Sequence, residues 1–168
     1  MTKIFEQDEI TLAVLADHLT DSGLQPEFID DETIRLRITS GIGYRISIVD
    51  DPKFMRLVTY FPLSKSIDVR KKLELEHILN EEVFMPSFYV DDDGTGDLWI
   101  TYVMPYQHGL IAGQFTYIVN RYASLLQYIV DEYNTDGVID FDIPSIDSNI
   151  EVDGHMDTLV PPKGSLIN

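Results

Sequence analysis

Near the start of the chain, apolar residues recur at the three- and four-residue spacing of a helix with one buried side. This spacing predicts a helix over about 8–22. Gly23 ends it, because glycine readily adopts the left-handed conformation found just after helices. The apolar positions on the predicted buried side are Leu12, Leu15, Ala16 and Leu19.

Strict alternation of apolar and polar residues follows, which is typical of strands with one buried face. Turn residues at 40–43 and 50–53 separate the alternating segments. The pattern therefore predicts an antiparallel meander with one face toward a core and the other toward water. The predicted strands are 27–29, 33–38, 44–48 and 55–61.

A second amphipathic helix follows the meander. Ser66 or Asp68 caps its N-terminus, because either side chain can accept a hydrogen bond from a backbone N–H group of the first turn. The predicted helix ends near Glu82, since Pro86 prevents any extension.

A hairpin and a long helix complete the pattern. Strands over 87–90 and 98–102 are joined by the acidic loop 91–97, which is rich in residues that tolerate positive φ angles. The last helix extends to residue 133 and is long enough to cover a whole sheet. Its predicted buried stripe is Ile111, Phe115, Ile118, Tyr122, Leu125, Ile129 and Tyr133.

These elements predict the α+β fold class, in the order helix, antiparallel meander, helix, β-hairpin and long C-terminal helix. At 168 residues the chain has room for one domain of ordinary size. We place this domain over 1–134. The remaining 135–168 are predicted to form an acidic C-terminal extension, partly extended and partly mobile.

The extension holds seven acidic residues and one basic residue. Ile139, Phe141 and Ile143 alternate with aspartates, so we expect 138–143 to lie against the domain as an added strand or an extended arm. Beyond Asp153 we expect a mobile chain, because ordering each residue costs about 1–2 kcal/mol of backbone entropy with little apolar area to offset it.

The chain carries 29 acidic against 12 basic residues, a formal net charge of −17. Nucleic acids and anionic membranes repel such a surface, so we expect neither as a partner. The charge either keeps the protein soluble or steers it toward a basic protein surface. No apolar run reaches the ~18 residues of a membrane span, and the absence of cysteine fits a reducing compartment. The expected location is the cytoplasm.

The sequence shows no set of catalytic residues, and we predict no enzyme activity, no cofactor and no metal. Asp91 and Asp93 match the opening of a calcium-binding loop, but Tyr102 stands where such a loop needs a glutamate. The four histidines lie far apart and lack a zinc-binding spacing. They are His18, His77, His108 and His155.

The last helix carries a second stripe, offset from the predicted buried one. Its members are Tyr117, Arg121, Ser124 and Tyr128. Tyrosine and arginine are enriched at protein interfaces, so these residues are candidates for a partner or dimer interface. Tyrosines can also lie at the margin of a core with their hydroxyl groups in water, and the pattern is compatible with both interpretations.

Four segments of this chain resemble the YbjN family of bacterial proteins. They are Leu79-Asn80-Glu81-Glu82, the aromatic strand and acidic turn over 88–94, Ile100-Thr101-Tyr102-Val103-Met104-Pro105, and Gly109-Leu110. The resemblance covers roughly 8–134 and does not extend to the acidic tail. It implies a fold like that of type III secretion chaperones and a role in sensory transduction regulation. It implies no catalytic residues.

We therefore expect a non-enzymatic protein-binding module that works as a cytoplasmic homodimer with a protein partner. The alternative is a small-molecule or metal-dependent enzyme with its site on the open face of the sheet.

Overall fold

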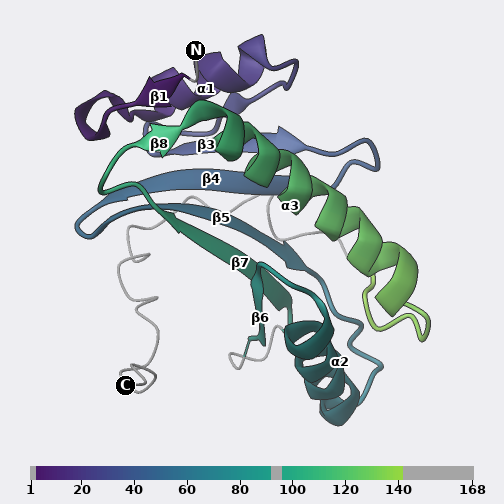
Figure 1. Ribbon diagram of the computed structural model, residues 1–168. Coiled ribbons are helices and arrows are strands. Elements are labelled where there is room, and N and C mark those ends of the chain that lie inside the picture. The colour runs from purple at the N-terminus through teal and green to yellow at the C-terminus, as the bar shows by residue number, and fades with distance from the viewer. Residues whose placement is uncertain (1–2, 92–95, 142–168) are drawn as a thin grey trace, which may run out of the picture.

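The structure is a computed structural model and describes residues 3–91 and 96–141. In this part of the chain, six strands form one antiparallel sheet, in the spatial order β2-β3-β4-β5-β7-β6 (Figure 1). The α+β fold class and the order of elements predicted from the sequence are confirmed. The strands are β2 (Glu27–Phe28), β3 (Thr33–Arg37), β4 (Gly43–Asp50), β5 (Lys53–Phe61), β6 (Ser87–Val90) and β7 (Leu98–Pro105).

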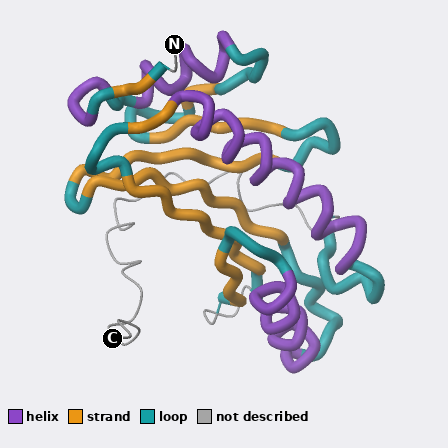
Figure 2. Tube along the Cα trace, in the orientation of Figure 1, coloured by secondary structure: helices purple, strands orange, loops and turns teal. Residues whose placement is uncertain are grey.

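All described helices contribute to a single core on one face of this sheet. They are α1 (Leu12–Asp21), α2 (Val69–Glu82) and α3 (Ala112–Tyr133). α3 runs diagonally across the sheet, and α2 lies beside β6 at the far end from α1 (Figure 2). Alternate strand residues face this core, for example Ile46 on β4 and Leu57 on β5, both fully buried. The other set of alternate residues faces away from the helices.

The first helix begins at Leu12, so the predicted start near residue 8 is wrong. Thr11 caps the helix, because its hydroxyl accepts a hydrogen bond from the Val14 backbone N–H at 3.3 Å. The preceding residues Gln7–Glu9 form a separate 3-10 turn, η1. Ile10 then adopts an extended conformation that interrupts the helical path.

The cap of α2 is Asp68 rather than Ser66. The Asp68 carboxylate accepts a hydrogen bond from the Arg70 backbone N–H at 2.7 Å. The Ser66 hydroxyl instead pairs with that of Ser64 at 2.9 Å. α2 ends at Glu82, as the sequence predicts.

α2 also protects the outer edge of β6. The Asn80 side-chain amide accepts from the Phe88 backbone N–H at 3.1 Å and donates to the Phe88 carbonyl at 2.9 Å. The Glu76 carboxylate accepts from the Val90 backbone N–H at 2.9 Å. Side chains of the helix thus replace the missing neighbouring strand at an edge that would otherwise attract another chain.

The buried side of α3 is wider than the predicted stripe. Val119 and Leu126 are fully buried although the stripe omits them, whereas Ile118 and Tyr133 are only partly buried. A helix lying flat across a sheet buries a broad band of residues rather than a single row. Tyr122 anchors the band, because its buried hydroxyl donates to the Ile100 carbonyl at 2.7 Å.

A second, two-stranded sheet holds the start of α3, and the sequence analysis did not anticipate it. It pairs β1 (Ile4–Phe5) with β8 (Leu110–Ile111). Gly109 has a φ of 85° and approaches so closely that a Cβ there would lie 2.7 Å from the Phe5 carbonyl oxygen. Glycine therefore satisfies both the conformation and the space at this position.

After α3 the chain turns back along the end of β5. The Ser64 backbone N–H donates to the Val138 carbonyl at 2.8 Å, and the Asp140 backbone N–H donates to the Pro62 carbonyl at 2.9 Å. The ring of Phe141 packs edge-on against that of Phe61, with centroids 5.4 Å apart. The rest of the arm predicted over 138–143, and the predicted mobile part beyond Asp153, lie outside the described residues.

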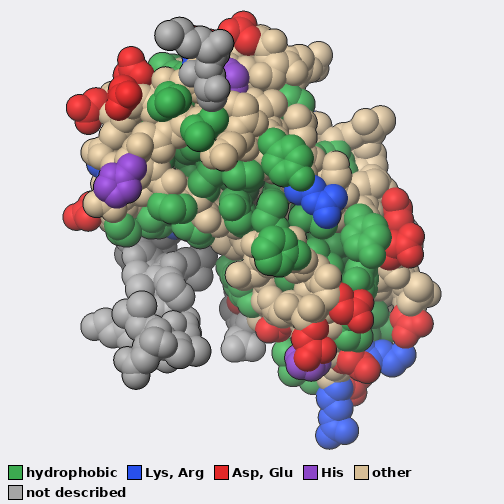
Figure 3. Space-filling view, viewed as in Figure 1, with side chains coloured by type: hydrophobic (Ala, Val, Ile, Leu, Met, Phe, Trp, Pro, Cys, Tyr) green, Lys and Arg blue, Asp and Glu red, His purple; other side chains and the backbone are tan. Residues whose placement is uncertain are grey.

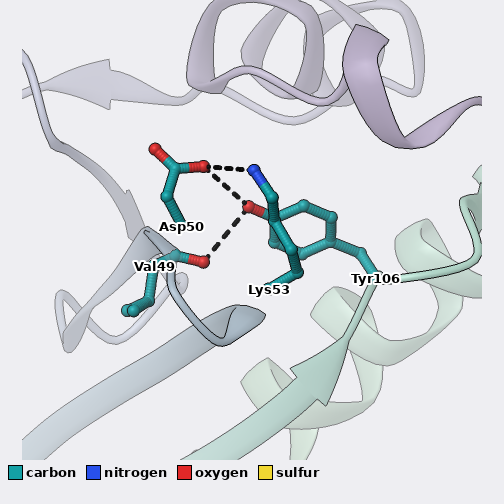
Figure 4. Close-up of polar contacts among 4 residues, drawn as sticks. All are labelled: Val49, Asp50, Lys53 and Tyr106. Carbon is teal, nitrogen blue, oxygen red and sulfur yellow. Dashed lines mark hydrogen bonds and ion pairs between the residues drawn. The ribbon is translucent and has the colours of Figure 1, made fainter.

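The turn between β4 and β5 is tied to the chain beyond β7 by a polar cluster (Figure 4). The hydroxyl of the buried Tyr106 donates to the Val49 carbonyl and lies 3.3 Å from the Asp50 carboxylate. The same Asp50 oxygen also accepts a hydrogen bond from the Lys53 ammonium at 2.9 Å. The hydrogen bond from Lys53 and the charge of its ammonium hold the pKa of the Asp50 carboxyl below its usual value. Burial raises the pKa of Tyr106, which stays a neutral donor.

We expect the stabilisation from Asp50 to depend on pH. Because its folded-state pKa is lowered, the stabilisation is present above the ordinary aspartate pKa of about 3.9 and is lost as the pH falls through the folded value. The difference in free energy of unfolding between wild type and Asp50→Asn should thus be steady near neutrality and shrink below about pH 4. Urea titrations at a series of pH values measure it. In a Lys53→Gln background the pH-dependent part of this free-energy difference should largely disappear. If it persists, the lowered pKa of Asp50 is not due to Lys53.

Candidate functional site

The outer side of α3 presents the second stripe predicted from the sequence to solvent. Tyr117 is 68% exposed and Tyr128 is 47% exposed. Arg121 and Ser124 are also exposed, and the Ser124 hydroxyl donates to the Asn120 carbonyl one turn back along the helix. Both aromatic rings are therefore largely open to solvent.

A hollow of about 320 Å³ opens beside this stripe, between the end of α2 and the middle of α3. Figure 3 shows hydrophobic side chains gathered on this face along α3 and toward α2, with acidic side chains around α2. The hollow includes Arg121 and Tyr128 of the predicted set, whereas Tyr117 and Ser124 are not among its lining residues. The lining residues are Glu82, Val83, Phe84, Arg121, Leu125 and Tyr128.

Phe84 is a member of this surface that the sequence analysis missed. It is 91% exposed, the highest value among the exposed large hydrophobic residues of the described chain. It follows the end of α2 and precedes Met85, whose φ of 113° is unfavourable for a residue with a side chain. A phenylalanine in the short connection between a helix end and a proline was the only available signal.

Contacts between the two helix ends hold the wall of the hollow in place. The Tyr133 hydroxyl donates to the Glu82 carboxylate at 2.9 Å. The ring of Tyr133 packs edge-on against that of Tyr128, with centroids 5.8 Å apart. Partial burial, followed by the hydrogen bond to Glu82, raises the pKa of Tyr133, so its hydroxyl remains a donor at neutral pH.

We define the α3 surface as Tyr117, Arg121, Ser124 and Tyr128 together with Glu82, Val83 and Phe84. It combines exposed aromatic rings with one cation and one carboxylate. Large, rigid rings bury much apolar area on binding, and the charged groups can pair with a partner at the edge of the contact. This arrangement suits recognition of another protein surface.

The alternative enzyme site was placed on the open face of the sheet, which lies opposite the helices. Side chains there include Arg45, Arg56 and the aromatic rings of Tyr60 and Trp99. Within residues 3–91 and 96–141, no group of three or more histidine, aspartate or glutamate side chains is placed to hold a metal ion. None of the helices in those ranges is long and apolar enough to cross a membrane.

Two solved structures share this fold, each at 18% sequence identity. One is described as "Crystal structure of YbjN, a putative transcription regulator from E. coli"; the match covers 77% of this chain and 96% of that chain, with a TM-score of 0.64. The other is the HopA1-SchA chaperone-effector complex, in which 70% of this chain matches 88% of that chain, with a TM-score of 0.50. The likeness to a chaperone fold inferred from the sequence is confirmed.

No curated protein sequence matches the chain. The sequence profile of the YbjN family, described as "Putative bacterial sensory transduction regulator", matches residues 11–133. This range contains the described sheet and helices from α1 to the end of α3. The family and the structural neighbours are regulators or chaperone-like proteins rather than enzymes. The chain belongs to the YbjN family.

Proposed function

We propose that this protein is a non-enzymatic protein-binding module of the cytoplasm, a regulator or chaperone that binds protein through the α3 surface. The observation that carries the proposal is the exposure of three aromatic rings on this surface: Phe84 and Tyr128 at the hollow that Arg121 also lines, and Tyr117 one helical turn before Arg121. Aromatic and arginine side chains dominate the binding energy of many protein interfaces.

A second copy of the chain is the first occupant that we propose for this surface, which makes the protein a homodimer. A long helix can pair with its own copy around a two-fold axis, so that each exposed residue is used twice. Arg121 and Glu82 carry opposite charges at the same hollow, and a two-fold contact can bring one against the other. The net charge of −17 supports a protein rather than a nucleic acid or a membrane as partner.

The double substitution Tyr117→Glu with Tyr128→Glu tests this interface. We expect wild type to sediment as a dimer at tens of micromolar and the double variant to sediment as a folded monomer. The reason is that four added carboxylates would meet across the two-fold contact, where like charges cost several kcal/mol. Sedimentation velocity, with circular dichroism to confirm folding, measures the result.

Phe28→Glu with Val69→Glu is the matched control. These residues are 56% and 61% exposed, respectively, and belong to β2 and the start of α2, outside the α3 surface. This control adds the same charge and should remain a dimer. A dimer that persists in the Tyr117→Glu, Tyr128→Glu variant would move the interface elsewhere, and a monomeric wild type would rule out the homodimer.

A further inference from the structure

The face of the sheet opposite the helices carries an unusual share of the chain's positive charge. Four of the six arginines lie on strands at positions that alternate with buried residues, and therefore point to this face. They are Arg35 and Arg37 on β3, Arg45 on β4 and Arg56 on β5. In a chain with a net charge of −17, this face is a distinct basic region.

The register of the strands brings these charges together. Arg35 and Arg45 are direct cross-strand partners, an arrangement in which like charges destabilise a sheet. Glu27 on the edge strand compensates part of this repulsion, because its carboxylate lies 3.0 Å from the Arg35 guanidinium. Arg56 faces the same side one row further along, opposite Ser47 and Val103. The geometry favours an anionic occupant along β4 and β5.

Aromatic rings continue the same face toward β6. Trp99 packs between Tyr60 and Tyr89, with ring centroids 5.4 Å and 5.9 Å away, and its plane is nearly parallel to that of Tyr89. The indole N–H of Trp99 donates to the Asp91 carboxylate at 3.1 Å, which fixes the ring. Tyr60, Trp99 and Tyr89 thus form a row of rings that offers apolar area next to the arginines. The face therefore suits a segment that mixes apolar and acidic residues.

The described chain ends at the end of β5 that carries Tyr60. Phe141 packs on Phe61, whose side chain is buried on the helix side of the sheet, and residues 138–140 run antiparallel to 62–64. The chain at this point is therefore heading back toward β5. Twelve more residues can span about 40 Å when extended, and crossing all six strands needs only about 24 Å.

The next twelve residues are complementary to this face in charge and in apolar character. Residues 142–153 contain four acidic residues and no basic residue, interspersed with apolar ones. The acidic residues are Asp142, Asp147, Glu151 and Asp153, and the apolar ones are Ile143, Pro144, Ile146, Ile150 and Val152.

We propose that residues 142–153 of the same chain bind across the open face of the sheet, with their carboxylates toward Arg45 and Arg56 and their apolar side chains toward the Tyr60–Trp99–Tyr89 row. The face is then a binding site for an extended acidic segment, and its occupant is the protein's own tail. It lies on the opposite side of the sheet from the α3 surface, so the proposal does not depend on the function proposed above.

Trp99 makes the proposal directly testable in the full chain, because it is the only tryptophan and its indole N–H gives a single NMR signal. The chain has no cysteine, so Ser148→Cys carries one nitroxide label at the centre of the proposed segment. We expect the label to broaden the Trp99 indole signal, and reduction of the nitroxide with ascorbate to restore it. Raised salt should weaken the effect, since screening reduces attraction between exposed charges.

Control labels and variants separate this contact from other causes. A label at Asp17→Cys on α1, at the other end of the molecule from β6 (Figure 1), should leave the Trp99 signal sharp. Adding Arg45→Gln and Arg56→Gln to the labelled Ser148→Cys chain should also restore the signal, whereas Arg45→Lys and Arg56→Lys should keep it broadened because the positive charge is retained.

Three results would overturn the proposal. The first is an unbroadened Trp99 signal in the labelled Ser148→Cys chain. The second is broadening in a mixture where the label and the isotope are on different molecules, which would make the occupant the tail of a second copy. The third is a shift of the Trp99 signal of the unmodified chain on adding a single-stranded RNA oligonucleotide, because arginines and stacked rings also suit nucleic acid.

Discussion

Replacing Tyr122 with alanine is expected to lower the free energy of unfolding by about 3–5 kcal/mol, the range for removing a large buried aromatic side chain. Tyr122 is fully buried in the middle of α3, with its ring 5.4 Å from that of Tyr44. Its hydroxyl donates to the Ile100 carbonyl on β7 at 2.7 Å. The substitution removes both the packing and the hydrogen bond that hold α3 on the sheet. Urea denaturation at neutral pH measures the change.

Two further variants show which contact is responsible. Tyr122→Phe keeps the ring and removes only the hydroxyl, so we expect a loss of about 1–3 kcal/mol. Tyr117→Ala removes the same side chain from the exposed side of the same helix and should change stability by no more than about 0.5 kcal/mol. Equal losses in Tyr117→Ala and Tyr122→Ala would show that α3 is not packed on the sheet by the side described.

Replacing Asn80 with alanine is expected to destabilise the protein by about 2–4 kcal/mol, a large effect for a residue exposed on a helix. The reason is that its amide satisfies both the N–H and the carbonyl of Phe88, a residue that is only 3% exposed. Each buried backbone group left without a partner costs about 1–3 kcal/mol. Chemical denaturation gives the energy, and hydrogen exchange at the Phe88 amide locates the change at the edge of β6.

Asn120→Ala is the matched control for this prediction. Asn120 is an exposed asparagine in the middle of α3, and alanine is the better helix former. The control should leave stability unchanged or slightly higher. A similarly small effect for Asn80→Ala would mean that the edge of β6 does not need the amide. In that case the Leu79-Asn80 pair that supports the family resemblance would require another explanation.

The order of elements follows from local patterns that act over a few residues. Alternation over 33–38 and 55–61 predicts strands because a pleated strand presents successive side chains to opposite faces, and the structure has these strands at Thr33–Arg37 and Lys53–Phe61. Gly23 and Pro86 mark the ends of helical segments through their own backbone preferences. The resemblance to the YbjN family rests on the same order of elements and is confirmed by the match over 11–133.

Two features were missed because a distant part of the chain decides them, and one helix boundary was wrong for a local reason. The pairing of β1 with β8 joins segments more than a hundred residues apart, and two-residue strands leave no periodic pattern to detect. The predicted helix start before Leu12 was wrong because the Thr11 side chain binds a backbone N–H group of the first turn, which makes Thr11 the cap and Leu12 the first helical residue. Phe84 became part of the candidate site only through the position of α2 beside α3.

The sequence by itself therefore determined the α+β class, the strands of the six-stranded sheet and the three α-helices. It also determined that Tyr117, Arg121, Ser124 and Tyr128 lie on one side of α3, because spacing along a regular element predicts which residues share a face. Only the tertiary structure decided that β7 pairs with β5 and that the end of α2 meets α3 to form a hollow. It also decided that the arginines of β3, β4 and β5 share one face with Trp99. Strand order and helix docking depend on how the whole apolar surface is buried at once, and no local pattern encodes that choice.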